Sequence, residues 1–282
     1  SSKFLRQRLP RVYFGNRWIK ESAADLWKND VCRFPLILTS DDFKHSTSLL
    51  KEGHIPKLRA IRLHNGTTYT WNRLCFGHSD KEPHLRIECR YIPAGPTVTD
   101  EFANFAFWIG LMNNQEKYGR DFWKNTDFKV AKTNFIKAAR TGFNTVFYWF
   151  GKNITAKQLI LDELLEMAYD GLVDSGVHVD EAKKYLSVIE KRTQWELTGS
   201  EWILKAHRDL VPRFGEVTAQ KTIVKQSLEY QKNNIPLHDW EPVKSNIYRI
   251  DIDEELVEEH MSTDIFCVST YDSIELTRQI LE

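Results

Sequence analysis

The sequence has few cysteines, no net charge and no long apolar run, and each of these shortages excludes a class of protein. Its 282 residues contain four cysteines without C-x-x-C spacing, which argues against a disulfide framework or a zinc site. Lysine plus arginine equals aspartate plus glutamate, at 39 each, so the overall basic charge typical of a nucleic-acid-binding protein is missing. No apolar run approaches the ~18 residues of a membrane-spanning helix, and no signal peptide is recognisable. We therefore expect a soluble, cytoplasmic protein with reduced thiols that binds neither nucleic acid nor membrane.

Residues 84–92 predict a β-strand whose two faces differ in chemistry. Alternation places four largely apolar side chains on one face: Leu85, Ile87, Cys89 and Tyr91. It places three long charged side chains, Arg86, Glu88 and Arg90, on the other face. Such a row suits a polyanionic ligand or a metal ion. The alternative is a solvated face with an Arg-Glu-Arg ladder, worth about 0–1 kcal/mol per exposed pair.

Helix signals follow this strand. A turn at residues 93–96 (PAGP) precedes Thr97 and Asp100, whose spacing marks a helix start. The helix expected over residues 101–112 is apolar nearly all round, which predicts that it is buried. Helices are also expected over residues 40–51, part of 118–153, 155–172, 180–191, 196–207 and 217–232.

Two long segments resemble the glutamate-cysteine ligase family of carboxylate-amine ligases. They are LRAIRLHNGTTYTWNR, residues 58–73, and HLRIECRYIPAGPTVTDEFANFAFWIGLM, residues 84–112. The resemblance extends from about residue 10 (PRVYFGNRW) to about residue 240. Within the family, the chain resembles the branch whose ligase domain is followed by a pair of CBS domains.

The resemblance implies an α+β fold similar to glutamine synthetase. Part of an antiparallel sheet would form the floor of the active site, with helices behind it and a helical C-terminal layer. Residues 1–241 would be the C-terminal part of the ligase domain and residues 242–256 a linker. Residues 257–282 would be the truncated start of a CBS domain, since such a domain needs roughly twice that length.

The family's chemistry assigns roles to the charged strand. In such a site ATP phosphorylates the side-chain carboxylate of glutamate, and the amine of cysteine attacks the acyl phosphate. Divalent cations and arginines offset the repulsion among the anionic groups. By this resemblance Glu88 would bind Mg²⁺, Arg86 would contact the ATP phosphates, and Arg90 would hold glutamate or its acyl phosphate. The implied ligands are ATP, Mg²⁺, glutamate and cysteine.

A second candidate region surrounds the dipeptide Asn-Gly at residues 65–66, which predicts a hairpin between two short strands. If the strand after this turn pairs beside Arg86, Asn72 and Arg73 reach the same ligand space, with His64 at the hairpin entrance. The alternative is that His64 only satisfies the turn.

The sequence also departs from the family. The acidic strands and the Glu-rich motif that complete the magnesium sites have no counterpart before Leu58. We therefore expect a fragment that works with the N-terminal half of the same ligase or with a homo-oligomer partner. Two hypotheses stay open. The first is an ATP-dependent ligase fragment of glutathione-type thiol biosynthesis, inactive alone. The second is a non-catalytic ligase-like scaffold or regulatory module coupled to CBS nucleotide sensing.

Overall fold

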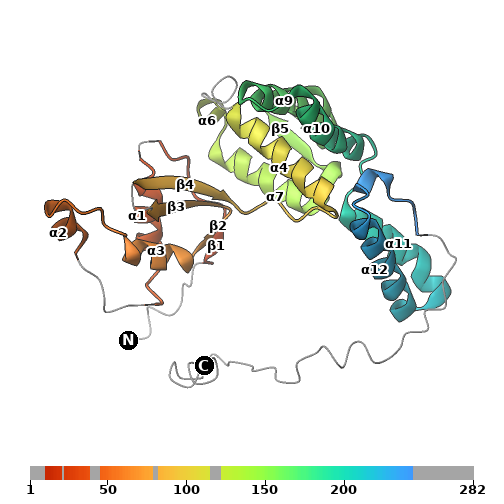
Figure 1. Ribbon diagram of the computed structural model, residues 1–282, viewed down its shortest axis with the longest axis horizontal. Helices are drawn as coiled ribbons and strands as arrows, with labels where there is room; N and C mark the ends of the chain where they lie inside the picture. The colour runs from red at the N-terminus through yellow and green to blue at the C-terminus, as the bar shows by residue number, and fades with distance from the viewer. Residues whose placement is uncertain (1–9, 21, 39–44, 79–81, 115–121, 244–282) are drawn as a thin grey trace, which may run out of the picture. The chain divides into compact units, whose positions relative to one another are not determined.

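The computed structural model describes residues 10–20, 22–38, 45–78, 82–114 and 122–243. The chain divides into two compact units, residues 1–243 and 244–282. The expected CBS segment and nearly all of the expected linker therefore lie outside the described residues. Within the described residues helices predominate and the strands form two-stranded sheets (Figure 1). This confirms the α+β class, whereas the glutamine-synthetase-like sheet stays a prediction.

The first part of the chain contains three short helices and a parallel pair of strands. In chain order the elements are β1 (Val12–Tyr13), α1 (Ala24–Arg33), α2 (Ser46–Lys51), α3 (Arg59–Gly66) and β2 (Tyr69–Thr70). Arg11 joins distant parts of this region, because its guanidinium donates to the carbonyl oxygens of Thr67 and Pro35. α2 confirms the second half of the helix expected over residues 40–51.

The hairpin expected at residues 65–66 is wrong, because these residues end α3. His64 is buried, and its Nε2 lies 3.0 Å from the carbonyl oxygen of Phe34. The hydroxyls of Thr67 and Thr68 donate to carbonyl oxygens of the last helical turn, which are the groups a helix end leaves unpaired. Asn and Gly suit a helix C-terminus as well as a hairpin turn, so the local signal was compatible with both structures.

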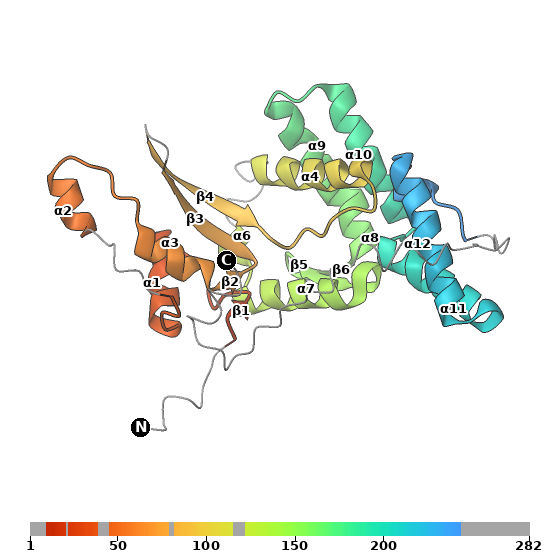
Figure 2. The same ribbon diagram turned by 60° about the horizontal axis from the view of Figure 1, so that its bottom comes forward.

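The charged strand is confirmed as part of an antiparallel hairpin, β3 (Asn72–His78) and β4 (Pro83–Cys89) (Figure 2). The register pairs Arg73 with Glu88 and Cys75 with Arg86. Because directly paired residues lie on the same face of a sheet, these four side chains share one face. β4 ends at Cys89, short of the expected end at residue 92.

The opposite face of the hairpin is more open than expected. Leu85 and Ile87 are 54% and 62% exposed. Helices of the described part of the chain therefore do not cover these two side chains.

The next helix, α4 (Val98–Asn113), begins as predicted, because the side chain of Thr97 accepts a hydrogen bond from the backbone N–H of Asp100. Ala103 is fully buried on one side of α4. On another side Phe102 and Phe105 are 53% and 57% exposed. The expectation of burial all round is therefore wrong for that side.

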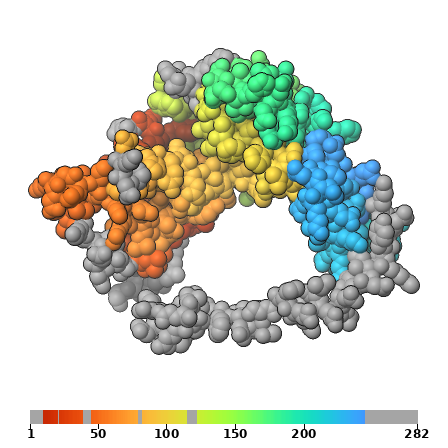
Figure 3. Space-filling view, viewed as in Figure 1, coloured from red at the N-terminus to blue at the C-terminus, as the bar shows by residue number. Residues whose placement is uncertain are grey.

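α9 (Leu165–Asp174) and α10 (Val179–Gln194) pack against α4, and the three helices form a continuous surface (Figure 3). Where α4 and α9 cross, their backbones touch. A Cβ atom on Gly110 would lie 2.1 Å from the carbonyl oxygen of Ala168, and one on Gly171 would lie 2.0 Å from the carbonyl oxygen of Gly110. Only glycine fits at these two positions.

The region between α4 and α9 holds both helices and a hairpin. Its elements are α6 (Phe122–Asn125), α7 (Phe128–Thr141), a 3₁₀ turn (Gly142–Asn144), β5 (Val146–Trp149), β6 (Lys152–Thr155), α8 (Ala156–Leu159) and a π-helical turn (Ile160–Leu164). α7 is the helix expected within residues 118–153, and the hairpin is an addition. Its turn residues Phe150 and Gly151 both have positive φ, a geometry that usually carries Asn-Gly.

The last part of the described chain is helical, as predicted. α11 (Gly199–Phe214) and α12 (Glu216–Lys232) pack together, and a 3₁₀ turn (Leu237–Asp239) follows. Their core is a cluster of buried residues: Trp202, Ala206, Leu210, Ala219, Ile223, Leu237 and Trp240. Among the described helices none is long and apolar enough to cross a membrane.

The α4–α9 crossing makes a test of the packing. Gly110→Ala should lower the free energy of unfolding by about 1–3 kcal/mol, because backbone atoms must move apart, although alanine is the better helix former. Gly66→Ala in α3 is the matched control, since nothing lies within 4 Å of its Cβ position. Urea denaturation measures both variants. A Gly110→Ala protein as stable as the control would contradict the crossing.

Candidate functional site

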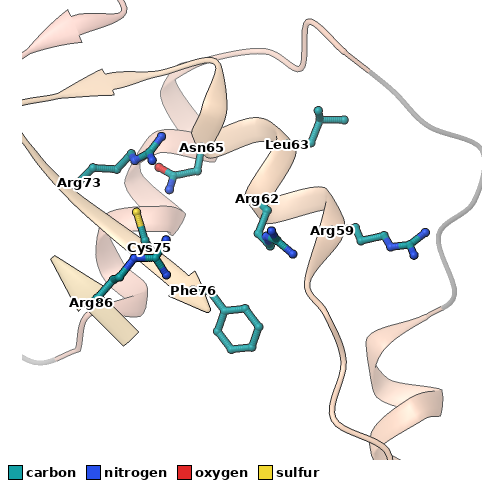
Figure 4. A pocket seen from close by; sticks show the side chains of 8 residues that line it. All are labelled: Arg59, Arg62, Leu63, Asn65, Arg73, Cys75, Phe76 and Arg86. Atoms are coloured by element: carbon teal, nitrogen blue, oxygen red, sulfur yellow. The ribbon is translucent and has the colours of Figure 1, made fainter. Parts of the chain in front are cut away.

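Side chains from α3 and the β3–β4 hairpin surround a cavity of about 480 Å³ (Figure 4). We call it the arginine pocket. Its lining residues are Arg59, Arg62, Leu63, Asn65, Arg73, Cys75, Phe76 and Arg86. Four of these eight residues are arginines and none is acidic, so the lining of the pocket is basic.

Local structure explains how the arginines meet. Arg59 and Arg62 are three residues apart in α3, which places them on one side of the helix. Asn65 fixes α3 against β3, because its amide donates to the carbonyl oxygen of Leu74 at 2.8 Å. Gly77 leaves room for the side chains of His84 and Arg86, since a Cβ atom there would lie 2.1 Å from His84 Nε2 and 2.9 Å from Arg86 Nη1.

Glu88 lies beside the pocket, between two arginines. Its Oε1 accepts a hydrogen bond from Arg90 Nε at 2.8 Å, and its Oε2 accepts one from Arg73 Nη2. The Cys75 thiol lies 3.5 Å from Oε2. We call this arrangement the Glu88 clamp. It links the two strands and fixes the direction of Arg73.

The clamp keeps Glu88 ionised. The hydrogen bond from Arg90 lowers the pKa of Glu88 to about 2, and Arg73 adds to this effect against the opposing effect of burial. Glu88 is therefore a carboxylate at neutral pH, and both of its oxygens are paired with guanidinium groups.

Arg90 takes part in the clamp and does not line the pocket. Its guanidinium carbon lies 4.5 Å from the centre of the Tyr69 ring, a cation–π contact. Its backbone N–H donates to the carbonyl oxygen of Trp71 at 2.9 Å. Arg90 therefore joins β4 to the segment between β2 and β3, and its role toward glutamate stays a prediction.

The structure brings two of the six predicted site residues, Arg73 and Arg86, to the arginine pocket. Asn72 lies on the opposite face of β3 from Arg73, since it pairs with Cys89. His64 is buried against Phe34. The expectation that Asn72, Arg73 and His64 share one ligand space is therefore wrong for Asn72 and His64.

Arg59 and Arg62 are pocket residues that the sequence reasoning missed. Their spacing of three residues is a signal only in a helix, whereas the Asn-Gly signal predicts a short strand before residues 65–66. A helical assignment of this segment puts both arginines on one face.

Glu88 does not by itself make a magnesium site. Both of its carboxylate oxygens accept hydrogen bonds from arginines. Among the residues that the structure describes, no group of three or more His, Cys, Asp or Glu side chains is placed to hold a metal ion. A Mg²⁺ site that included Glu88 would need acidic groups from outside those residues.

No protein-family model matches this chain, and no curated protein or solved structure matches it. The resemblance to glutamate-cysteine ligases therefore stays a prediction that rests on the segments quoted above.

The Glu88 clamp predicts a pH-dependent stability. Because the pKa of Glu88 falls from 4.5 to about 2 on folding, its stabilisation is complete above pH 4.5 and is lost as the pH falls toward 2. At pH 6 Glu88→Gln should lower the free energy of unfolding by about 1 kcal/mol, a modest value because solvent screens a carboxylate this exposed. The difference from wild type should shrink at pH 3.

Urea denaturation at the two pH values measures this effect. Glu229→Gln on the exposed side of α12 is the control and should change stability little at either pH. An effect of Glu88→Gln that is equal at pH 6 and pH 3 would show that the clamp does not depend on the charge.

Proposed function

We propose that this chain is a fragment of an ATP-dependent carboxylate-amine ligase that joins glutamate and cysteine through an acyl phosphate. The observation that supports the proposal best is the arginine pocket, four of whose eight lining residues are arginines, with no acid among them. A triphosphate is the substrate of this reaction that needs the most positive charge.

In this proposal Arg86 and Arg62 contact the phosphates of ATP. Both side chains are exposed to solvent at the pocket, and a planar guanidinium binds two phosphate oxygens at once. Arg73 is held by Glu88, so it offers its remaining N–H donors in a fixed direction. The pocket binds and orients the phosphate chain and reduces its repulsion with the glutamate carboxylate.

Magnesium would add charge neutralisation between the phosphates. Because both Glu88 oxygens already accept bonds from arginines, we derive no step of the reaction through a metal held by this residue. The pocket's contribution is the guanidinium groups.

The same clamp favours a second candidate function. Glu88 forms ion pairs with both Arg73 and Arg90, as expected of a charged ladder that stabilises the hairpin. This supports the alternative of a non-catalytic ligase-like scaffold. In that case the arginine pocket would bind nucleotide or another polyanion without turnover.

Phosphate binding by the pocket is testable with ATP and with inorganic tripolyphosphate. Arg86→Lys keeps the charge and loses the two-point contact. It should therefore lower the binding affinity for both ligands by roughly 3- to 10-fold in isothermal titration at fixed salt. The melting temperature should stay nearly unchanged, because Arg86 is exposed.

Arg208→Lys, on an exposed position of α11, is the matched control and should bind like wild type. Equal loss of affinity in both variants would mean that only net charge matters. Unchanged affinity in Arg86→Lys would remove this residue from the phosphate site.

Activity of the isolated chain is a separate test. Since the described residues bring no three or more His, Cys, Asp or Glu side chains together to hold a metal ion, we expect residues 1–282 alone to form no γ-glutamylcysteine from ATP, glutamate, cysteine and Mg²⁺. ADP release that requires both amino acids would contradict this expectation. Binding of tripolyphosphate without turnover would agree with it.

A further inference from the structure

A second cavity, of about 650 Å³, lies next to the loop that follows β4. It is formed by residues 91–96, α4, α10 and the beginning of α11. Its volume is that of a small-molecule site. None of the arginine-pocket residues lines it, so the two cavities are separate.

The walls of this cavity are mainly apolar. Side chains from five different segments contribute to them: Ile92, Phe107, Trp108, Phe143, Ile160 and Ile189. Ile160 begins the π-helical turn over Ile160–Leu164, and such turns are frequent at functional sites. These walls suit an apolar body, aromatic or branched aliphatic.

One cationic side chain, Arg192, lines the cavity, and no acid is among its lining residues. Arg192 is 13% exposed. Its Nη2 donates to Asn104 Oδ1, and its Nη1 lies 3.5 Å from Asp100 Oδ1. That distance is longer than the 2.7–2.9 Å usual for a charge-assisted hydrogen bond, and Asp100 Oδ1 has no hydrogen bond within the described residues.

A guanidinium carries five N–H donors, and the bond to Asn104 with the long contact to Asp100 leaves Arg192 donors available to a ligand in the cavity. Burial lowers the pKa of Arg192, and Asp100 offsets this effect only in part. An anionic ligand in the cavity, which Arg192 lines, would accept hydrogen bonds from these donors.

The start of α11 adds further donors to the same cavity. The capping box satisfies the backbone N–H groups of Thr198 and Glu201. Gly199 and Ser200, which also line the cavity, are the first two residues of the helix. Their N–H groups have no acceptor within the helix, and the helix dipole favours negative charge there.

We propose that this cavity binds a small carboxylate with an apolar body, whose carboxylate is held by Arg192 and the beginning of α11. This inference is independent of the proposed ligase function, since neither Arg192 nor α11 takes part in the arginine pocket.

The test uses the complete 282-residue chain and two probes, 2-naphthoate and its neutral analogue 2-naphthamide. In isothermal titration 2-naphthoate should bind at least ~10-fold more tightly than 2-naphthamide, because only the carboxylate pairs with a guanidinium. Tripolyphosphate, which is directed to the arginine pocket, should not displace it. Equal affinity of the two probes, or displacement by tripolyphosphate, would overturn the proposal.

Two variants locate the binding. Arg192→Lys keeps a positive charge beside Asp100 and loses the planar contact, so it should lower the affinity for 2-naphthoate by roughly 10-fold. Ala94→Trp, at an exposed position of the cavity rim, should lower the affinity for both probes because the larger side chain occludes the cavity. This variant tests the location of binding if Arg192→Lys does not fold. Arg86→Lys should leave 2-naphthoate binding unchanged. Wild-type affinity in Ala94→Trp would place the probe elsewhere and overturn the proposal.

Discussion

The register of the β3–β4 hairpin is the constraint on which the candidate site depends. Glu88 stands opposite Arg73 and Cys75 stands opposite Arg86, so one face of the hairpin carries the charged side chains toward α3. A slip of one residue would turn every one of them to the other face. The bond from Arg73 of β3 to Glu88 of β4 opposes such a slip, because it crosses the hairpin. The backbone hydrogen bond from Arg90 to Trp71 crosses it as well.

The clamp also separates the arginines that pair with Glu88 from others that line the pocket without an acidic neighbour in its lining. Arg73 and Arg90 share the single negative charge of Glu88, and of these two arginines only Arg73 lines the pocket. Arg62 and Arg86 line a pocket without an acid. Bringing like charges together is unfavourable unless an anion or solvent separates them. A polyanionic ligand would remove this repulsion, which is why we favour phosphate binding at this pocket over a purely structural role.

Sequence patterns predicted the elements whose signal is local. The alternation over residues 84–92 gave β4 and its charged face, and Thr97 and Asp100 marked the start of α4. The errors arose where distant contacts decide the structure. Asn-Gly at residues 65–66 suits both a hairpin and a helix end, and the contact of His64 with Phe34 favours the helix. Because of that error the sequence analysis did not identify Arg59 and Arg62 as site residues, since they share a face only in a helix.

The most direct test of the account is an NMR measurement of the arginine side-chain Nε–Hε signals during titration with tripolyphosphate. The arginine pocket predicts that the signals of Arg62, Arg73 and Arg86 shift together with one affinity. The signal of Arg90, held between Glu88 and Tyr69, should shift far less. Signals that move at Arg90 and stay fixed at Arg62 and Arg86 would contradict the account.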